Sequence, residues 1–204
     1  NEFRSRHYKN KFMKNIIIIT SIFLSLSFFL GNKNNPETVG LKIGDFAPEL
    51  RGASPSGDSI SLRNLRGHFV LIDFWASWCR PCRYENRNLI KTVEHFKECD
   101  FPSGKNWVGK TKTKKGFKVF SVSLDRSAAS WKKAIKQDRL NWPWHISDLK
   151  WWNSAYASLY QIQSIPENIL INPSGQIVAK NLRGKTLDNV LETYRYKPNL
   201  VKNK

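Results

Sequence analysis

Two cysteines separated by two residues, Cys79 and Cys82, are the pair in this chain best suited to chemistry. Such a pair can close a small disulfide and open it again, and the attacking species in that exchange is a thiolate. An apolar run typical of a strand (69–74) precedes the pair, and a run with helical spacing (83–97) follows it. We therefore expect Cys79 at a strand-to-helix turn, where free N–H groups and the helix dipole favour the thiolate.

Three other uses of paired cysteines fit this sequence less well. Zinc needs four ligands, and the chain adds only Cys99 and scattered histidines without a second paired spacing. Covalent haem requires a histidine directly after the second cysteine, where Arg83 stands instead. A purely structural disulfide that closes so small a loop gains little chain-entropy stabilisation. Redox exchange is the interpretation we prefer, with no metal and with Cys99 as a buried, inert thiol.

The residues around the pair resemble those of a known family. The segment Asp73–Cys82 reads Asp-Phe-Trp-Ala-Ser-Trp-Cys-Arg-Pro-Cys and looks like the active-site segment of thioredoxins. It is more similar still to the TlpA/ResA-like group, thioredoxin relatives of the bacterial envelope. The likeness covers residues 41–195, and its opening motif is one that this group shares with peroxiredoxins. Further matching segments follow in the family's order: 44–48, 65–67, 121–125 and 164–166.

The resemblance implies an α/β thioredoxin-like fold, a central mixed sheet flanked by helices, with an N-terminal hairpin extension. Apolar periodicity along the chain predicts the order β-α-β-α-β-β-α, with parallel pairing early and antiparallel pairing late. Besides the elements around the cysteines, we expect a hairpin within 41–62, strands over 117–124, 169–171 and 176–179, and helices over 128–137, 154–160 and 186–194.

A carboxylate in the apolar run before the pair, Asp73, is costly to bury unless it is paired or used. Its position, six residues before Cys79, is also that of the buried acid of thioredoxins. We expect Cys79 to be the exposed nucleophile and Cys82 the buried resolving cysteine. Asp73 would then take the Cys82 proton, directly or through a water.

The resemblance also implies where the substrate binds. It implies a cis peptide bond before Pro166, lying against the cysteine pair. The backbone of Ile165 would hold an extended substrate segment as an added strand. Trp78, Arg80 and Pro81 complete the predicted substrate-binding residues.

These residues predict a thiol–disulfide oxidoreductase. The resemblance implies that it reduces disulfides of envelope proteins, with cytochrome c maturation or cell redox homeostasis as the process. It would need an upstream electron donor and no cofactor beyond its Cys79–Cys82 disulfide. Pro81 and the lack of a histidine between the cysteines favour a reducing site, whereas Arg80 favours the thiolate and raises the potential somewhat. The alternatives are a peroxiredoxin-type peroxidase, whose reactive cysteine has another sequence context, and a non-catalytic adaptor.

The N-terminal part of the chain has the pattern of a targeting segment. Residues 1–12 precede the only Met and are interpreted as an upstream or cloning-derived leader. Residues 13–31 hold a basic start and the apolar run 16–30, which suits a signal-peptide core and is short for a spanning helix. We expect a signal peptide or membrane anchor there, a linker over 32–40 and the thioredoxin-like domain over 41–204. Basic residues before the apolar run predict export to the periplasm or envelope.

The chain is strongly basic, with a net charge of +18. Such a surface can attract anionic lipid or nucleic acid. The basic residues are dispersed and no nucleic-acid module is visible, so we expect no nucleic-acid partner. The lysine-rich segment 103–116 is interpreted as a solvated loop, and the tryptophans at 142–144 and 151–152 as core and rim packing.

Overall fold

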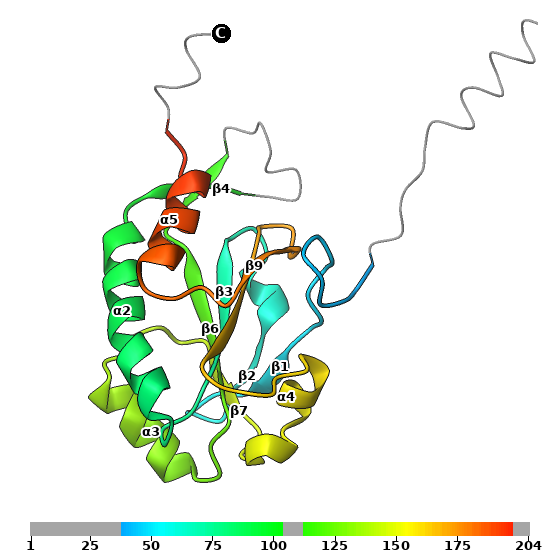
Figure 1. Ribbon diagram of the computed structural model, residues 1–204, viewed down its shortest axis with the longest axis vertical. Helices are drawn as coiled ribbons and strands as arrows, with labels where there is room; N and C mark the ends of the chain where they lie inside the picture. Colours follow the sequence, from blue (N-terminus) through cyan, green and yellow to red (C-terminus); the bar gives the residue numbers. More distant parts are fainter. Residues whose placement is uncertain (1–37, 104–111, 198–204) are drawn as a thin grey trace, which may run out of the picture. The chain divides into compact units, whose positions relative to one another are not determined.

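The computed structural model describes residues 38–103 and 112–197, which belong to one unit beginning at Thr38 (Figure 1). The expectations for the leader, for the signal peptide or anchor, and for most of the linker fall outside these residues. No helix within the described part of the chain is long and apolar enough to cross a membrane.

The main sheet has the strand order β7-β6-β3-β8-β9. The central strand β3 is parallel to β6, which is parallel to β7, and it is antiparallel to β8, which is antiparallel to β9. The expected mixed sheet, parallel early and antiparallel late, is confirmed. Its strands are β3 (Val70–Trp75), β6 (Lys118–Ser123), β7 (His145–Ser147), β8 (Glu167–Ile171) and β9 (Ile177–Lys180).

Helices cover both faces of this sheet because each strand buries alternate side chains on opposite faces. On one face, Leu71 packs with apolar residues of α2 (Arg80–Phe96) and α5 (Lys185–Tyr194), which lie side by side in Figure 1 and are joined by a 2.6 Å hydrogen bond from Thr92 to Asp188. On the other face, Ile72 and Phe74 pack with α3 (Ala128–Gln137) and α4 (Ala155–Leu159). Asp73 alternates with Ile72 and Phe74, so it faces α2.

The predicted N-terminal hairpin is present. Strands β1 (Arg51–Ala53) and β2 (Ser59–Ser61) pair antiparallel, and a 3₁₀ helix, η1 (Leu62–Leu65), follows them. Leu50 and Leu62 are fully buried in the same core as Ile72, which fixes the extension against the sheet. A second 3₁₀ helix, η2 (Trp151–Asn153), precedes α4.

Two expectations need correction. The ends of the predicted loop 103–116 are not all loop: β5 (Thr113–Lys115) pairs antiparallel with β4 (Asp100–Pro102), while residues 104–111 lie outside the described part. Cys99 is half-buried rather than buried, because it packs at the edge of the apolar cluster that includes Phe96 and Phe101.

Candidate active site

The cysteine pair lies where the strand-to-helix turn was expected. Cys79 is the N-cap of α2, and the Cys82 N–H points to the Cys79 Sγ at 3.2 Å. Helix α2 therefore begins at Arg80, three residues earlier than predicted, with Pro81 in the first turn, where its missing N–H costs nothing. The two sulfurs form a disulfide of 2.03 Å.

Both cysteines are covered in this oxidised form. Cys79 is 4% exposed and Cys82 is 1% exposed, so the expected order holds but the expected exposure of Cys79 does not. The cover comes from the loop before β8, where the Ile165–Pro166 peptide bond is cis. The Ile165 carbonyl oxygen lies 3.7 Å from the Cys79 Sγ. The cis-proline loop, more than eighty residues away in sequence, thus covers Cys79, which was predicted to be exposed.

Asp73 is 5% exposed and accepts no side-chain hydrogen bond from any described residue. Burial raises its pKa from 3.8 to about 7; the Arg183 guanidinium opposes this rise and the Glu85 carboxylate adds to it. Asp73 and Cys82 line the same small cavity, with about 10 Å³ of space, close to the lower limit for one water. The Asp73 carboxyl group and the Cys82 side chain therefore border the same enclosed space.

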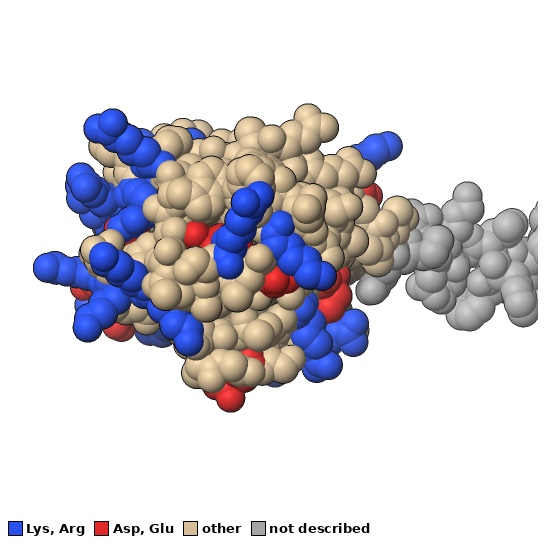
Figure 2. Space-filling model, turned by 90° about the horizontal axis from the view of Figure 1, so that it is seen from below, with Lys and Arg blue, Asp and Glu red and all other residues tan. Residues whose placement is uncertain are grey.

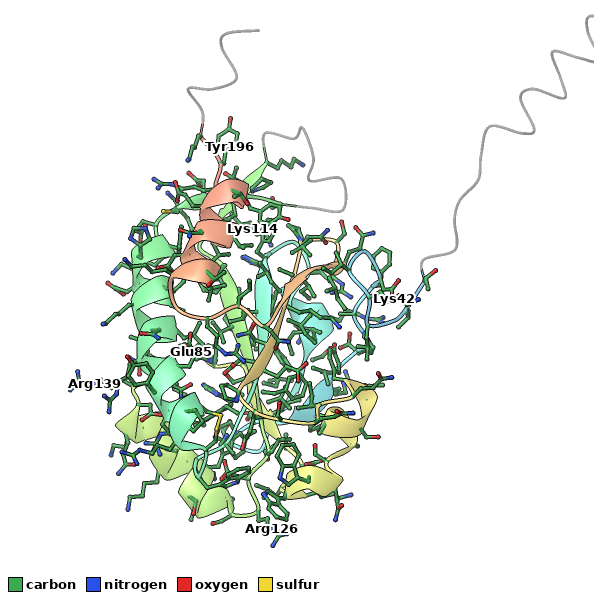
Figure 3. All side chains as sticks on the ribbon, in the orientation of Figure 1. Lys42, Glu85, Lys114, Arg126, Arg139 and Tyr196 are labelled. Carbon is green, nitrogen blue, oxygen red and sulfur yellow. A yellow bond between two sulfur atoms is a disulfide. The ribbon has the colours of Figure 1, made fainter. Side chains whose placement is uncertain are left out.

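Two charged residues near Asp73, Glu85 and Arg183, were not predicted from the sequence. Glu85 lines the same cavity and accepts a 2.7 Å hydrogen bond from the Gly184 N–H, which ties α2 to the loop before α5 (Figure 3). Arg183 donates to the Pro166 carbonyl and so holds the cis-proline loop. Glu85 follows Cys82 by three residues on a helix, a spacing that places both on one face. Arg183 left no such signal, because it is 110 residues from Asp73.

Two groups of ion pairs and hydrogen bonds hold the active-site loop. Arg83 donates to both carboxylate oxygens of Asp138, one at 2.7 Å, and to the Ser77 carbonyl at 3.1 Å. Asp125 accepts from the Ser77 N–H at 3.0 Å and from the Ser77 and Ser123 hydroxyls. The turn before Cys79 is therefore fixed from β6 and from the end of α3.

The predicted substrate-binding residues surround the disulfide. Trp78 is 48% exposed, and its indole N–H donates to the Leu124 carbonyl at 3.3 Å. Its ring lies 6.2 Å from those of Trp151 and Trp152. Arg80 is exposed at the first position of α2. Trp151 and Trp152 therefore pack against Trp78 at the surface, which agrees with the expected rim packing and places that rim beside the active site.

No group of three or more His, Cys, Asp or Glu side chains that could hold a metal ion occurs among residues 38–103 and 112–197. The redox-capable group of this site is the Cys79–Cys82 disulfide.

Comparison with known proteins agrees with this geometry. The family model described as thioredoxin-like matches residues 67–177. A thiol–disulfide oxidoreductase ResA from Bacillus cereus is 24% identical over 189 residues, 93% of this chain and 97% of that relative. The structure of the thioredoxin domain of a thiol–disulfide oxidoreductase from Bacteroides vulgatus is 36% identical, with a TM-score of 0.63, and the match covers 77% of this chain and 100% of that one.

A third match is the solution structure of a thiol:disulfide interchange protein from Bacteroides sp., 33% identical with a TM-score of 0.63. It covers 80% of this chain and 96% of that one. The fold, the half-chain family match and these identities show the class: the chain belongs to the thioredoxin-like family. Within that family, its relatives of known structure and its curated relatives include thiol–disulfide oxidoreductases, and the Bacillus cereus relative is named ResA.

Proposed function

We propose that this thiol–disulfide oxidoreductase reduces disulfides of proteins in the bacterial envelope, with cytochrome c maturation or general redox homeostasis as its setting. The observation that carries the proposal is the Cys79–Cys82 disulfide at the N-terminus of α2, beside the cis-proline loop and above the buried Asp73. The relatives' named activity supports the same chemistry.

In the first step the reduced protein attacks its substrate. The Cys79 thiolate, favoured by the helix dipole, attacks one sulfur of a partner's disulfide. That disulfide breaks, a Cys79–partner disulfide forms, and the second partner sulfur leaves as a thiolate that takes a proton. The Ile165 backbone, next to the Cys79 sulfur, is available to hold an extended partner segment.

In the second step Cys82 releases the partner. Cys82 must lose its proton before its sulfur attacks that of Cys79. Asp73 shares a cavity with Cys82 and has a pKa of about 7, so at neutral pH it can take up and later release that proton. The Cys79–Cys82 disulfide closes, two electrons pass to the partner, and its remaining sulfur leaves as a thiolate.

The direction of electron flow is tested by the midpoint potential. Arg80 and Pro81 stand between the cysteines, and no histidine is there to stabilise the thiolate strongly. Equilibration with glutathione buffers, read by tryptophan fluorescence, should give a midpoint nearer the roughly −270 mV of thioredoxin than the roughly −120 mV of a strong oxidant. A midpoint above about −160 mV on that scale would reverse the proposed direction.

The partners are tested by trapping. Cys82→Ala should accumulate mixed disulfides with envelope proteins in cells, because no resolving sulfur remains. The matched control, Cys79→Ser with Cys82→Ala, should capture none. Equal capture by both variants contradicts Cys79 as the nucleophile.

Export through the N-terminal segment is a further part of the proposal. It rests on the apolar run 16–30 and its basic flank, and on relatives that work on disulfides. An alkaline phosphatase fusion after Gly40 should be active in a bacterial host. An inactive phosphatase fusion together with an active cytoplasmic reporter at the same point would contradict export.

A further inference from the structure

A hollow of about 380 Å³ opens beside Trp78, and the cis-proline loop contributes nothing to its lining. The lining comes from the turn before Cys79, from the start of α3 and from η2: Ser77, Trp78, Asp125, Arg126, Ser127, Ser130 and Trp151. Because Trp78 directly precedes Cys79, a substrate side chain near the attacked cysteine can enter it. The two proposed steps of disulfide exchange use no residue that lines this hollow.

The cation in this hollow has no carboxylate partner among the described residues. The Arg126 side chain is exposed and lies over the Trp151 ring, 3.8 Å from its centre. Arg80, two residues after Trp78, is likewise exposed and forms no ion pair within the described ranges. Arg83, by contrast, forms an ion pair with Asp138 and donates to both of its carboxylate oxygens.

The one carboxylate in the lining does not cancel this charge by pairing with Arg126. Asp125 is 1% exposed, and its oxygens already accept from the Ser77 backbone and from the Ser77 and Ser123 hydroxyls. Three further acidic residues near the active site, Asp73, Glu85 and Glu167, are not part of the hollow.

The backbone of Trp151 is held in a rare conformation, with φ of 55°. A bulky residue in this left-handed region is strained, and such strain persists only where the surroundings require it. Here it places the ring under Arg126 and 6.2 Å from Trp78. The ring therefore holds the Arg126 guanidinium at the hollow. Because the side chain is already ordered, it loses less conformational entropy when it binds an anion.

The end of the molecule that carries Arg126 is mainly basic. Figure 3 labels Arg126 at this end, and Figure 2, which views the same end, shows more Lys and Arg than Asp and Glu, with some carboxylates between them. The whole chain has a net charge of +18. Such a surface speeds the approach of an acidic partner and disfavours a basic one.

We propose that the hollow beside Trp78 is a substrate subsite in which Arg126, fixed over Trp151, binds an acidic side chain close to the attacked cysteine of a disulfide-bearing polypeptide. This inference rests on the proposed function and adds to it the chemical class of the preferred substrate. Electrostatic recognition of this kind acts mainly on the rate of association.

The test uses three synthetic peptides with one disulfide, identical except for Glu, Gln or Lys beside the attacked cysteine. Their second-order rate constants with the reduced protein are followed by tryptophan fluorescence. The Glu peptide should react about threefold faster than the Gln peptide, the size of one exposed ion pair, and the Lys peptide should be slowest. The preference should fade between about 10 mM and about 1 M salt, as the screening length falls from roughly 30 Å to roughly 3 Å.

Variants at Arg126 test whether this residue causes the preference for the Glu peptide. Arg126→Gln should bring the Glu and Gln rates together, Arg126→Lys should keep part of the difference, and Arg126→Glu should make the Lys peptide the fastest of the three. The matched control is Arg139→Gln, an exposed arginine that Figure 3 shows far from Arg126 and whose loss should leave all three rates unchanged.

The outcomes distinguish a failure of the subsite from a failure of the proposed function. Equal rates for the three peptides, or a Glu preference that survives in Arg126→Gln, would overturn the subsite alone. If the reduced protein reacts with none of the peptides, the proposed function fails and the subsite fails with it.

Discussion

Two carboxylates, Asp73 and Asp125, are buried to a similar degree near the ends of neighbouring parallel strands, yet their surroundings differ. Asp125 is 1% exposed and accepts from a backbone N–H and two hydroxyls. Asp73 is 5% exposed, accepts no side-chain hydrogen bond from the described residues and borders a small cavity instead. Hydrogen bonds stabilise a buried carboxylate, whereas burial without them raises its pKa.

From this difference we infer a structural role for Asp125 and the proposed chemical role for Asp73. Asp125 holds the turn at Ser77 and so positions the cysteine loop. Asp73 has a pKa of about 7 and shares its cavity with Cys82, so it is able to exchange a proton near neutral pH. Substitution of each by asparagine, which keeps the shape and removes the charge, tests the contrast.

The largest expected effect is on the pH dependence of stability. The folded-state pKa of Asp73 is raised above the unfolded value, so the folded protein binds the proton more tightly and loses stability as pH rises from about 4 to about 7. Above pH 7 the cost is about 4 kcal/mol, at 1.36 kcal/mol per pKa unit. Oxidised Asp73→Asn should therefore unfold less readily than the parent at pH 8, with the advantage vanishing near pH 4.

Urea unfolding of both proteins across this pH range measures the difference. The stability of the parent against pH does not by itself isolate the contribution of Asp73, because burial also lowers the pKa of His68 and of His145 to about 4. These histidines make stability rise with pH between about 4 and 6.5 in both proteins, and the subtraction removes them. A pH-independent difference between parent and variant would contradict the raised pKa.

A smaller and opposite change is expected at the other carboxylate. Asp125→Asn should lower the free energy of unfolding by about 3 kcal/mol, because hydrogen bonds to a charged, buried acceptor are weakened. The same urea measurement at pH 8 makes the comparison direct: one asparagine stabilises and the other destabilises. A loss below about 0.5 kcal/mol, the usual range for surface changes, would remove the structural role of Asp125.

Next comes the rate of substrate release. Asp73→Asn should slow the Cys82 attack on a preformed Cys79 mixed disulfide about a hundredfold at pH 7, the lower range for loss of a positioned general base. Stopped-flow release of a fluorescent thiol from Cys79 gives this rate. The formation of the mixed disulfide, which does not need Asp73, is the internal control. An unchanged release rate would refute proton transfer by Asp73.

The smallest effect concerns the two charges beside Asp73. Arg183 lowers the Asp73 pKa and Glu85 raises it. The midpoint of the release-rate profile against pH should therefore move up in Arg183→Gln and down in Glu85→Gln. Shifts of the same sign in both variants would show a general disturbance of the loop that Arg183 and Glu85 share.

Much of the fold was predictable because its signals are local. The apolar run over β3 and the helical spacing after Cys82 depend on neighbours within a few residues. The predicted helix over 128–137 matches α3, and other element bounds moved by up to three residues at their ends. The start of α2 moved because Cys79 caps the helix and brings Arg80 and Pro81 into its first turn.

The sequence by itself determined the redox pair, the strand and helix that carry it, and an acid in an apolar strand. Only the tertiary structure decided what surrounds them. Ile165 covers Cys79, and the Arg183 charge lowers the pKa of Asp73. The Trp151 ring lies under the Arg126 guanidinium. Sequence patterns report local periodicity, whereas exposure, pKa and charge pairing are set by contacts between segments far apart in the chain.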